Sequence, residues 1–327
     1  MSVAGKKFLL IINPASGTVS KHRIVPHLYR RMLRLAADFD IAFSRGPGHA
    51  RYLAAEAAAK GFYGVIACGG DGTVNEIATG LAGTPTALGI VPSGSGNGLA
   101  RHIGIPIDID LSLKVIAENN IISADYGTAN GVPFFCTFGV GFDAAVSERC
   151  ARESRRGALM YLKSSFSEYI KFHPEEYEIR VGDKVLTERA FLVVCCNASQ
   201  YGNNAFIAPQ ASITDGALDF VIVHAGNIFT QAAMGIDMLT GMIKKNSYID
   251  VIRAPEAVIR RKTEGAAHAD GDSVRMPATI EVKCHPGKLR LFAPTASTRF
   301  RPLATPVRML LRDMALSLRH LWPLGGQ

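Results

Sequence analysis

Three glycines and an acidic residue lie together in the stretch Gly69–Glu76, which reads Gly-Gly-Asp-Gly-Thr-Val-Asn-Glu. An apolar run at 63–68 precedes it and apolar residues at helical spacing follow it, so the stretch lies at a strand-to-helix junction. Glycine lets a ligand approach the bare backbone, and the first N–H groups of a helix attract anions. The pattern predicts a phosphate-binding turn that carries its own carboxylate. The spacing of Thr73 and Glu76 also fits a capping box, with Asp71 as a plain helix cap.

A second loop of small residues, Ser93–Asn97, follows an apolar run at 87–91. Its backbone N–H groups and its two hydroxyls could surround phosphate oxygens, although an ordinary turn has the same composition. Neither loop is followed by the Gly-Lys-Ser/Thr of a Walker motif. The first predicted strand, 7–12, leads into Asn13–Gly17 and not into GxGxxG, which argues against a dinucleotide-binding fold.

Four predicted strands must position these loops. Apolar runs at 7–12, 40–44, 63–68 and 87–91 alternate with helical patterns, which predicts a doubly wound parallel sheet with helices on both faces. The carboxyl ends of parallel strands share one edge of such a sheet, and ligands bind there. The polar residues that we therefore expect to converge at this edge are Asn13, Ser44, Asp71 and Ser93.

The pattern of predicted secondary structure changes after the first third of the chain. Short β-rich runs separated by Gly, Asn, Asp and Pro dominate there, which predicts a mainly antiparallel β-sandwich. We place the nucleotide-binding α/β domain at 1–122 and the β-rich domain at 123–295. The tail, 296–327, contains an amphipathic helix, which we expect to pack back on the first domain. A helix that lies on a membrane surface is the alternative.

The composition limits the class of partner. A net charge of +8 suggests an anionic partner, but the sequence has no block of five Lys/Arg residues and no zinc-finger spacing, so we expect no nucleic acid. None of the six cysteines forms a CxxC pair, which fits a reducing cytoplasm. The apolar runs are too short for a signal peptide or a membrane span, so we expect a cytoplasmic protein that is at most peripherally membrane-associated.

Taken together and in order, the motifs resemble the signature of the diacylglycerol kinase and sphingosine kinase superfamily, and the bacterial soluble lipid kinases most closely. The resemblance covers roughly residues 6–295. The segments that carry it are Asn13–Gly17, Gly69–Glu76, Ser93–Asn97, Gly139–Ala144, Asp215–Asp219 and Asp270–Asp272. The Gly-Gly-Asp-Gly turn alone is also similar to NAD kinases and phosphofructokinases, whereas the ordered set is specific to the lipid kinases.

The resemblance implies an NAD-kinase-like first domain that binds ATP and Mg²⁺, and a cleft between the domains where the γ-phosphoryl group passes to a lipid hydroxyl. Asp272 takes the place of a glutamate that the family usually has, and we expect it to be the general base, with Asp71 or Asp270 as alternatives. Asp71, Asp125 and Asp215 match positions that organise Mg²⁺. The residues implied for the nucleotide are Asn13, Ser44, Gly70, Gly72, Thr73, Ser93, Gly94, Ser95, Gly96 and Asn97.

The acceptor is not fixed by these motifs, because they hold phosphate. Diacylglycerol at the membrane surface is the first expectation, and a sphingoid base or another lipid alcohol is the next. An NAD-kinase-like enzyme for a small molecule and a non-catalytic nucleotide or lipid sensor are alternatives, and a homodimer stays open.

Overall fold

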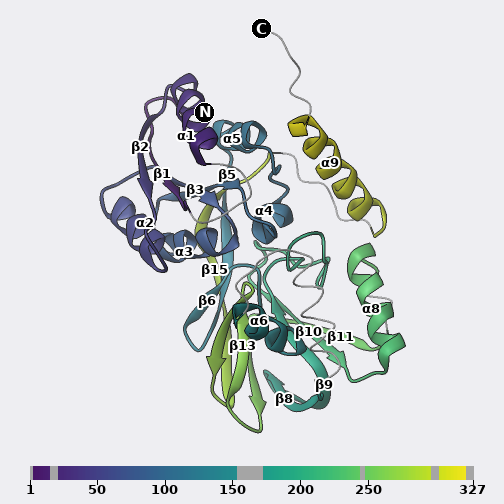
Figure 1. Cartoon of the computed structure of the whole chain (residues 1–327). Helices are drawn as coiled ribbons and strands as arrows, with labels where there is room; N and C mark the ends of the chain where they lie inside the picture. The colour runs from purple at the N-terminus through teal and green to yellow at the C-terminus, as the bar shows by residue number, and fades with distance from the viewer. Residues whose placement is uncertain (1–2, 15–20, 153–171, 244–246, 296–301, 322–327) are drawn as a thin grey trace.

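The N-terminal part of the chain alternates strand and helix, as Figure 1 shows in purple and blue. The computed structural model describes residues 3–14, 21–152, 172–243, 247–295 and 302–321. The elements of this part are β1 (Lys7–Ile12), α1 (Lys21–Arg34), β2 (Asp38–Phe43), α2 (His49–Ala59), β3 (Gly64–Gly69), α3 (Asp71–Leu81), β4 (Ala87–Pro92), α4 (Gly98–Ile103) and α5 (Ile109–Ala117).

The four strands form a parallel sheet in the order β2-β1-β3-β4. Each buried strand divides its side chains between two cores. In β3, Val65 and Ala67 pack with residues of α2 and α3, whereas Ile66 and Cys68 pack with residues of α1 and α5. The alternation of side chains along a strand therefore requires a layer of helices on each face. The expected doubly wound α/β domain is confirmed.

Most of the rest of the chain is antiparallel sheet in the lower half of Figure 1, whereas β5 and α9 reach into the upper half. It confirms the second, β-sandwich part of the predicted fold class. Its elements are β5 (Ile121–Ala129), β6 (Val132–Phe134), β7 (Thr137–Gly141), α6 (Phe142–Arg152), β8 (Glu175–Val181), β9 (Lys184–Cys196), β10 (Leu218–His224), α8 (Ile228–Thr240), β11 (Ile249–Ala254), β12 (Glu256–Arg261), β13 (Gly265–Ala269), β14 (Asp272–Met276), β15 (Thr279–Phe292) and α9 (Ala304–Leu321).

A ribbon of two long strands, β5 and β15, connects the two parts. The two strands pair antiparallel from Ile121 opposite Phe292 to Ala129 opposite Val282. The beginning of β15 also pairs with β12, and its end joins the first sheet where Leu291 lies opposite Leu88 of β4. Hydrogen-bonded sheet thus runs without a break from one domain into the other, and the predicted boundary at 122 falls inside β5.

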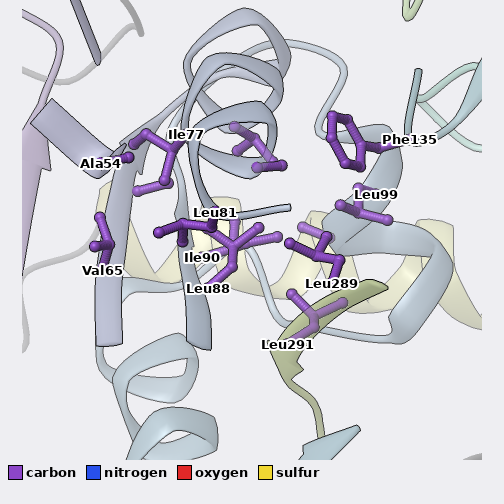
Figure 2. Packing of buried hydrophobic residues seen from close by; sticks show 14 of the residues in the cluster. Ala54, Val65, Ile77, Leu81, Leu88, Ile90, Leu99, Phe135, Leu289 and Leu291 are labelled. Carbon is purple, nitrogen blue, oxygen red and sulfur yellow. The ribbon is translucent and has the colours of Figure 1, made fainter. Parts of the chain in front are cut away.

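The core also crosses between the domains. Phe135, which follows β6, packs with Leu99 of α4 and Leu289 of β15 in the cluster that contains the buried faces of α2 and α3. Figure 2 shows these side chains beside Leu88 and Ile90 of β4. Because close-packed interiors resist displacement, this shared cluster fixes the orientation of the second domain relative to the first.

The helix α9 begins beside α8, and the packing of the tail on the first domain stays a prediction. The N–H group of Leu303 donates to the carbonyl of Thr240 at 2.8 Å, so α9 begins where α8 ends. Figure 1 shows the two helices following each other along one side of the molecule. The packing described for α9 is against α8, and α8 belongs to the β-rich domain.

Within the described residues, no helix is both long enough and apolar enough to cross a membrane.

A histidine of the first domain bonds the second. His102 of α4 lies 2.9 Å from the Ser199 hydroxyl, and its Nδ1 accepts the N–H group of Ser199 at 3.1 Å. Burial lowers the pKa of His102 from its ordinary 6.5 to about 4. Between pH 6.5 and about 4, His102 is protonated in the unfolded chain and neutral in the folded chain. The free energy of unfolding therefore falls as the pH falls through this range.

We expect a His102→Asn variant, which keeps an acceptor and does not titrate, to lose less stability than the wild type on acidification from pH 6.5 to about 4. The difference in slope should approach about 1.4 kcal/mol per pH unit. Urea unfolding at a series of pH values measures it. Parallel curves for the two proteins would contradict the assignment.

Candidate active site

Four strand ends meet at one edge of the parallel sheet. The N–H group of Asn13 donates to Cys68 at 3.4 Å, that of Ser44 to Ile12 at 3.0 Å, and that of Ser93 to Gly69 at 2.9 Å. The predicted convergence of these loops is therefore present. The chain leaves β1 towards β2 and leaves β3 in the opposite direction towards β4, so β1 and β3 flank the switch point of the sheet, where ligands bind in folds of this kind.

The side chains of Thr73 and Glu76 form hydrogen bonds with residues outside α3. Gly70 is the N-cap of α3, and no side chain of the described residues bonds that cap. Thr73 instead accepts a hydrogen bond from Asn13 at 3.1 Å. Glu76 accepts the N–H groups of Gly48 and Ala50 at 2.8 and 3.0 Å, and so holds the start of α2. The capping-box interpretation is wrong for α3.

Asp71 bonds the second small-residue loop. Its two carboxylate oxygens accept the N–H groups of Asn97 at 2.8 Å and Gly98 at 2.6 Å, at the start of α4. Burial raises the pKa of Asp71 above its ordinary value, and the N–H groups of Gly98 and Asn97 oppose that shift. A carboxylate with both oxygens bonded in this way positions a loop and is poorly suited to accept a proton from a substrate.

The glycines of the two loops allow the loops to touch. A Cβ atom on Gly94 would lie 2.5 Å from the Cα of Gly70, and one on Gly96 would lie 2.7 Å from a carboxylate oxygen of Asp71. Asn97 has a φ of 52° and bonds Gly94 through both groups of its side-chain amide. These small residues are therefore required by the contact between the loops, whatever ligand the loops bind.

One group in this region has unused bonding capacity. The hydroxyl of Ser93 is enclosed and has no hydrogen-bond partner among the described residues. Ser95, two residues further on, is exposed. A phosphate oxygen is an acceptor that could satisfy a hydroxyl at this strand end.

Asp270 holds the second domain against the first. It has a φ of 51° and, with Gly271, forms the two-residue turn between β13 and β14. Its carboxylate accepts the amide of Asn75 at 2.8 Å from α3, and three backbone N–H groups, those of Phe135, Cys136 and Thr137, at 2.7 to 2.9 Å. Burial raises the pKa of Asp270, which these donors oppose. With four donors on its two oxygens, Asp270 is a poor candidate for the base.

Asp272 of β14 lies near Gly72 of the glycine turn. Its side chain is exposed, and one of its carboxylate oxygens is 3.8 Å from the point that a Cβ atom on Gly72 would occupy. The hairpin β13–β14 and its bond to Asn75 therefore bring an acid of the β-rich domain to the glycine turn of the α/β domain.

A buried cluster behind this turn has no signal in the sequence. His268 of β13 lies 2.8 Å from a carboxylate oxygen of Asp143, and the same oxygen accepts the hydroxyl of Tyr201 at 3.0 Å. The N–H group of Gly271 donates to the other ring nitrogen of His268 at 3.4 Å, so the histidine supports the turn that carries Asp272. Asp143 lies in α6, Tyr201 in the loop after β9 and His268 in β13, so only the fold reveals the cluster.

The acids predicted to organise Mg²⁺ have other partners in the structure. Asp125 accepts the N–H groups of Gly216 and Gly287, both at 2.7 Å, and Asp215 lies 3.1 Å from the guanidinium of Arg253. In the described part of the chain, no group of three or more His, Cys, Asp or Glu side chains could hold a metal ion. The described residues do not form a metal site by themselves, and the metal roles of Asp71, Asp125 and Asp215 stay predictions that these contacts do not favour.

A parallel α/β sheet with a glycine turn at its switch point, faced by an acid from an antiparallel domain, defines a two-domain kinase fold. Two families match consecutive parts of the chain: the diacylglycerol kinase catalytic domain over residues 7–129, and the YegS C-terminal NAD kinase beta sandwich-like domain over residues 136–293. The chain belongs to the diacylglycerol kinase and YegS-like lipid kinase family, and it is a lipid kinase.

The chain is 30% identical over 251 residues to a protein of Chromohalobacter salexigens named as a YegS-like lipid kinase, which covers 75% of this chain and 80% of that protein. It is 26% identical over 273 residues to a diacylglycerol kinase of Bacillus subtilis, with 82% and 90% covered. A match of 26% identity to an uncharacterised Synechocystis protein spans 72% of this chain and 55% of that protein.

The fold is also similar to a crystal structure described as a diacylglycerol kinase of Bacillus anthracis. The TM-score is 0.69 and the sequence identity is 24%, with 90% of this chain and 98% of that chain covered.

Gly72 offers a test of whether a ligand contacts the bare backbone. A Cβ atom there meets only the Asp272 oxygen at ordinary van der Waals distance, so we expect Gly72→Ala to fold with unchanged or slightly higher stability. If a phosphate group approaches this backbone, the added methyl group should lower kcat/KM for the phosphate donor by about 10- to 100-fold.

The matched control is Gly235→Ala in α8, a helical glycine with open space around its Cα, which should keep full activity. Gly94→Ala, which clashes with Gly70, should instead lose stability. Full activity of the Gly72 variant in a steady-state assay would exclude the contact.

Proposed function

We propose that this lipid kinase transfers the γ-phosphoryl group of ATP to the hydroxyl of diacylglycerol in the cleft between its two domains. The observation that carries the proposal is the position of Asp272, whose carboxylate faces Gly72 of the glycine turn at the switch point. Phosphoryl transfer to an alcohol requires a base for the hydroxyl proton and a site that binds the phosphates. Asp272 of the β-rich domain would be the base, and the glycine turn of the α/β domain would bind the phosphates.

The proposed nucleotide site is the strand-end edge. Gly70, Gly72 and Thr73 would line the phosphates at the start of α3, where backbone N–H groups favour anions. Across the edge lies the loop Ser93–Asn97, whose enclosed Ser93 hydroxyl has no bonding partner in the described structure. Asn13 is bonded to Thr73, and Ser44 follows the adjacent strand, so both lie within the same row of strand ends.

The proposed reaction uses the residues of this chain in two ways. The Asp272 carboxylate accepts the proton of the lipid hydroxyl as that oxygen forms a bond to the γ-phosphorus. The bond between the γ-phosphorus and the β,γ-bridging oxygen breaks, and ADP leaves with its electron pair. Asp71 and Asp270 keep the two loops in place and do not exchange protons with the substrate. Mg²⁺ takes one or two protein carboxylates plus phosphate oxygens, so the nucleotide phosphates would supply most of its ligands.

Diacylglycerol is proposed as the acceptor because relatives that match most of this chain are named diacylglycerol kinase. A sphingoid base or another lipid alcohol is the next candidate, since the reacting group is again a hydroxyl. The unpaired cysteines, five of them buried, support a reducing cytoplasm as the compartment, with peripheral attachment to the membrane. A homodimer stays a prediction.

The acceptor is tested by incubating the purified chain with labelled ATP, Mg²⁺ and one acceptor at a time. We expect label in phosphatidic acid when diacylglycerol is the acceptor, and less than about a tenth of that rate with a sphingoid base or NAD. Product mass spectrometry identifies the labelled compound. Faster labelling of the sphingoid base or of NAD would replace diacylglycerol as the substrate, and no transfer to any acceptor would remove the proposal.

Asparagine substitutions at Asp270 and Asp272 should have different effects, one on stability and the other on catalysis. Asp272 is exposed, so Asp272→Asn should fold with an unchanged melting temperature and lower kcat by at least about 100-fold. Asp270→Asn replaces an acceptor with an amide facing N–H donors, so it should lower the free energy of unfolding by about 1–3 kcal/mol.

Asp183→Asn, an exposed carboxylate in the β8–β9 turn, is the matched control and should change neither quantity. A fully active Asp272→Asn variant would exclude Asp272 as the base.

A further inference from the structure

The outward face of α8 is apolar, which is the reverse of an ordinary surface helix. Phe229 is 80% exposed, Ile236 is 63% exposed, and Ala232, Ala233 and Leu239 are exposed beside them. These positions recur at three- and four-residue intervals and so form one stripe. Asp237 is the only charged residue of the helix. A soluble surface helix normally turns charged and polar residues towards water.

The helix is nevertheless well formed at both ends. The side chain of Asn227 accepts the N–H groups of Phe229 and Thr230, both at 3.0 Å, and so caps the start of α8. Gly241 ends it with a φ of 72°. Its other face is anchored by Met234, which is buried against the β9 and β10 side of the core. The exposed stripe is therefore held in place by the fold.

The helix α9 extends the stripe. It starts at the end of α8, through the bond from Leu303 to Thr240, and its exposed apolar residues again recur at three- and four-residue intervals. We call the two stripes together the α8–α9 ridge. From α8 it contains Phe229, Ala232, Ala233, Ile236 and Leu239. From α9 it contains Val307, Leu310, Leu311 and Met314, together with Leu303, which directly precedes α9.

One basic residue of α9, Arg308, is exposed next to Val307 of the ridge. The whole chain carries a net charge of +8. An exposed apolar stripe on a chain with an excess of positive charge suits the interface of an anionic bilayer.

We propose that the α8–α9 ridge is the surface by which this chain binds an anionic phospholipid bilayer, with its apolar side chains inserted among the lipids. The inference deepens the proposed function, because a long-chain diacylglycerol resides in such a bilayer and the kinase must reach it there. Two capped or anchored helices following one another give an extended line of contact, which suits a planar membrane.

Binding is tested with the full-length protein and without ATP, by sedimentation with vesicles of phosphatidylcholine and phosphatidylglycerol in equal parts, and with vesicles of phosphatidylcholine alone. We expect stronger binding to the anionic vesicles, which added salt weakens. The variants Ile236→Gln and Leu310→Gln each remove one apolar side chain from the ridge, and each should weaken binding by about tenfold.

Two residues of the first domain provide matched controls. Tyr52 is 63% exposed, like Ile236, and Leu33 is 56% exposed, against 55% for Leu310. Tyr52→Gln and Leu33→Gln should bind vesicles like the wild type. If the double variant of Ile236 and Leu310 binds vesicles as tightly as the wild type, the proposal is overturned.

Activity assays separate this inference from the proposed function. The double variant should phosphorylate a water-dispersed short-chain diacylglycerol at the wild-type rate and lose activity towards diacylglycerol in vesicles. Equal loss on both substrates would place the ridge in catalysis and overturn the proposal. A wild-type chain that binds vesicles and phosphorylates no lipid would remove the proposed function and leave the ridge as a membrane-binding surface.

Light scattering addresses the rival partner, a second copy of the chain. A wild-type dimer that the two substitutions convert to a monomer, with vesicle binding unchanged, would assign the ridge to dimerisation and overturn the membrane proposal.

Discussion

The structure of this lipid kinase depends on carboxylates that accept backbone N–H groups from distant loops. Asp71 holds the start of α4, Glu76 holds the start of α2, and Asp270 holds the segment after β6 together with Asn75. Charge-assisted bonds to N–H groups are stronger than neutral ones, and a partly buried carboxylate is costly without them. The burial that raises the pKa of Asp71 and Asp270 also makes their bonded geometry specific.

This constraint separates the tasks of neighbouring acids. Asp270 and Asp272 are two residues apart in one turn, yet one has four donors on its carboxylate and the other is exposed opposite Gly72. Asp270 sets the position of the hairpin, and the side chain of Asp272 is exposed near Gly72. His268 supports the same turn from behind, through Asp143 and Gly271. Preorganisation of this kind matters because a small displacement of a reacting group slows transfer severely.

The two domains are connected by a shared sheet, a shared core and a hydrogen bond between side chains. The β5–β15 ribbon continues the sheet from one domain to the other, and Phe135 packs in the core of the first domain. The bond between Asn75 and Asp270 then crosses directly between the glycine turn and the hairpin. The glycine turn and the β13–β14 hairpin are consequently fixed by sheet, core and hydrogen bond at once, while α8 and α9 lie along one side of the molecule.

The sequence by itself determined the α/β class, the order of the strands along the chain and the row of strand-end loops, because the periodicity of apolar residues and the punctuation by glycine are local properties. It also identified Asp272 and the glycine turn, through motifs in a recognisable order. The structure shows that Asp270 and Gly271 form a hairpin turn, and the catalytic role of Asp272 stays a proposal. The tertiary structure alone decided the partners of Asp71, Glu76 and Asp270, the cluster around His268 and the bond that joins the start of α9 to the end of α8. Each of them depends on contacts between residues far apart in the chain, and no local pattern encodes which loop a carboxylate will reach.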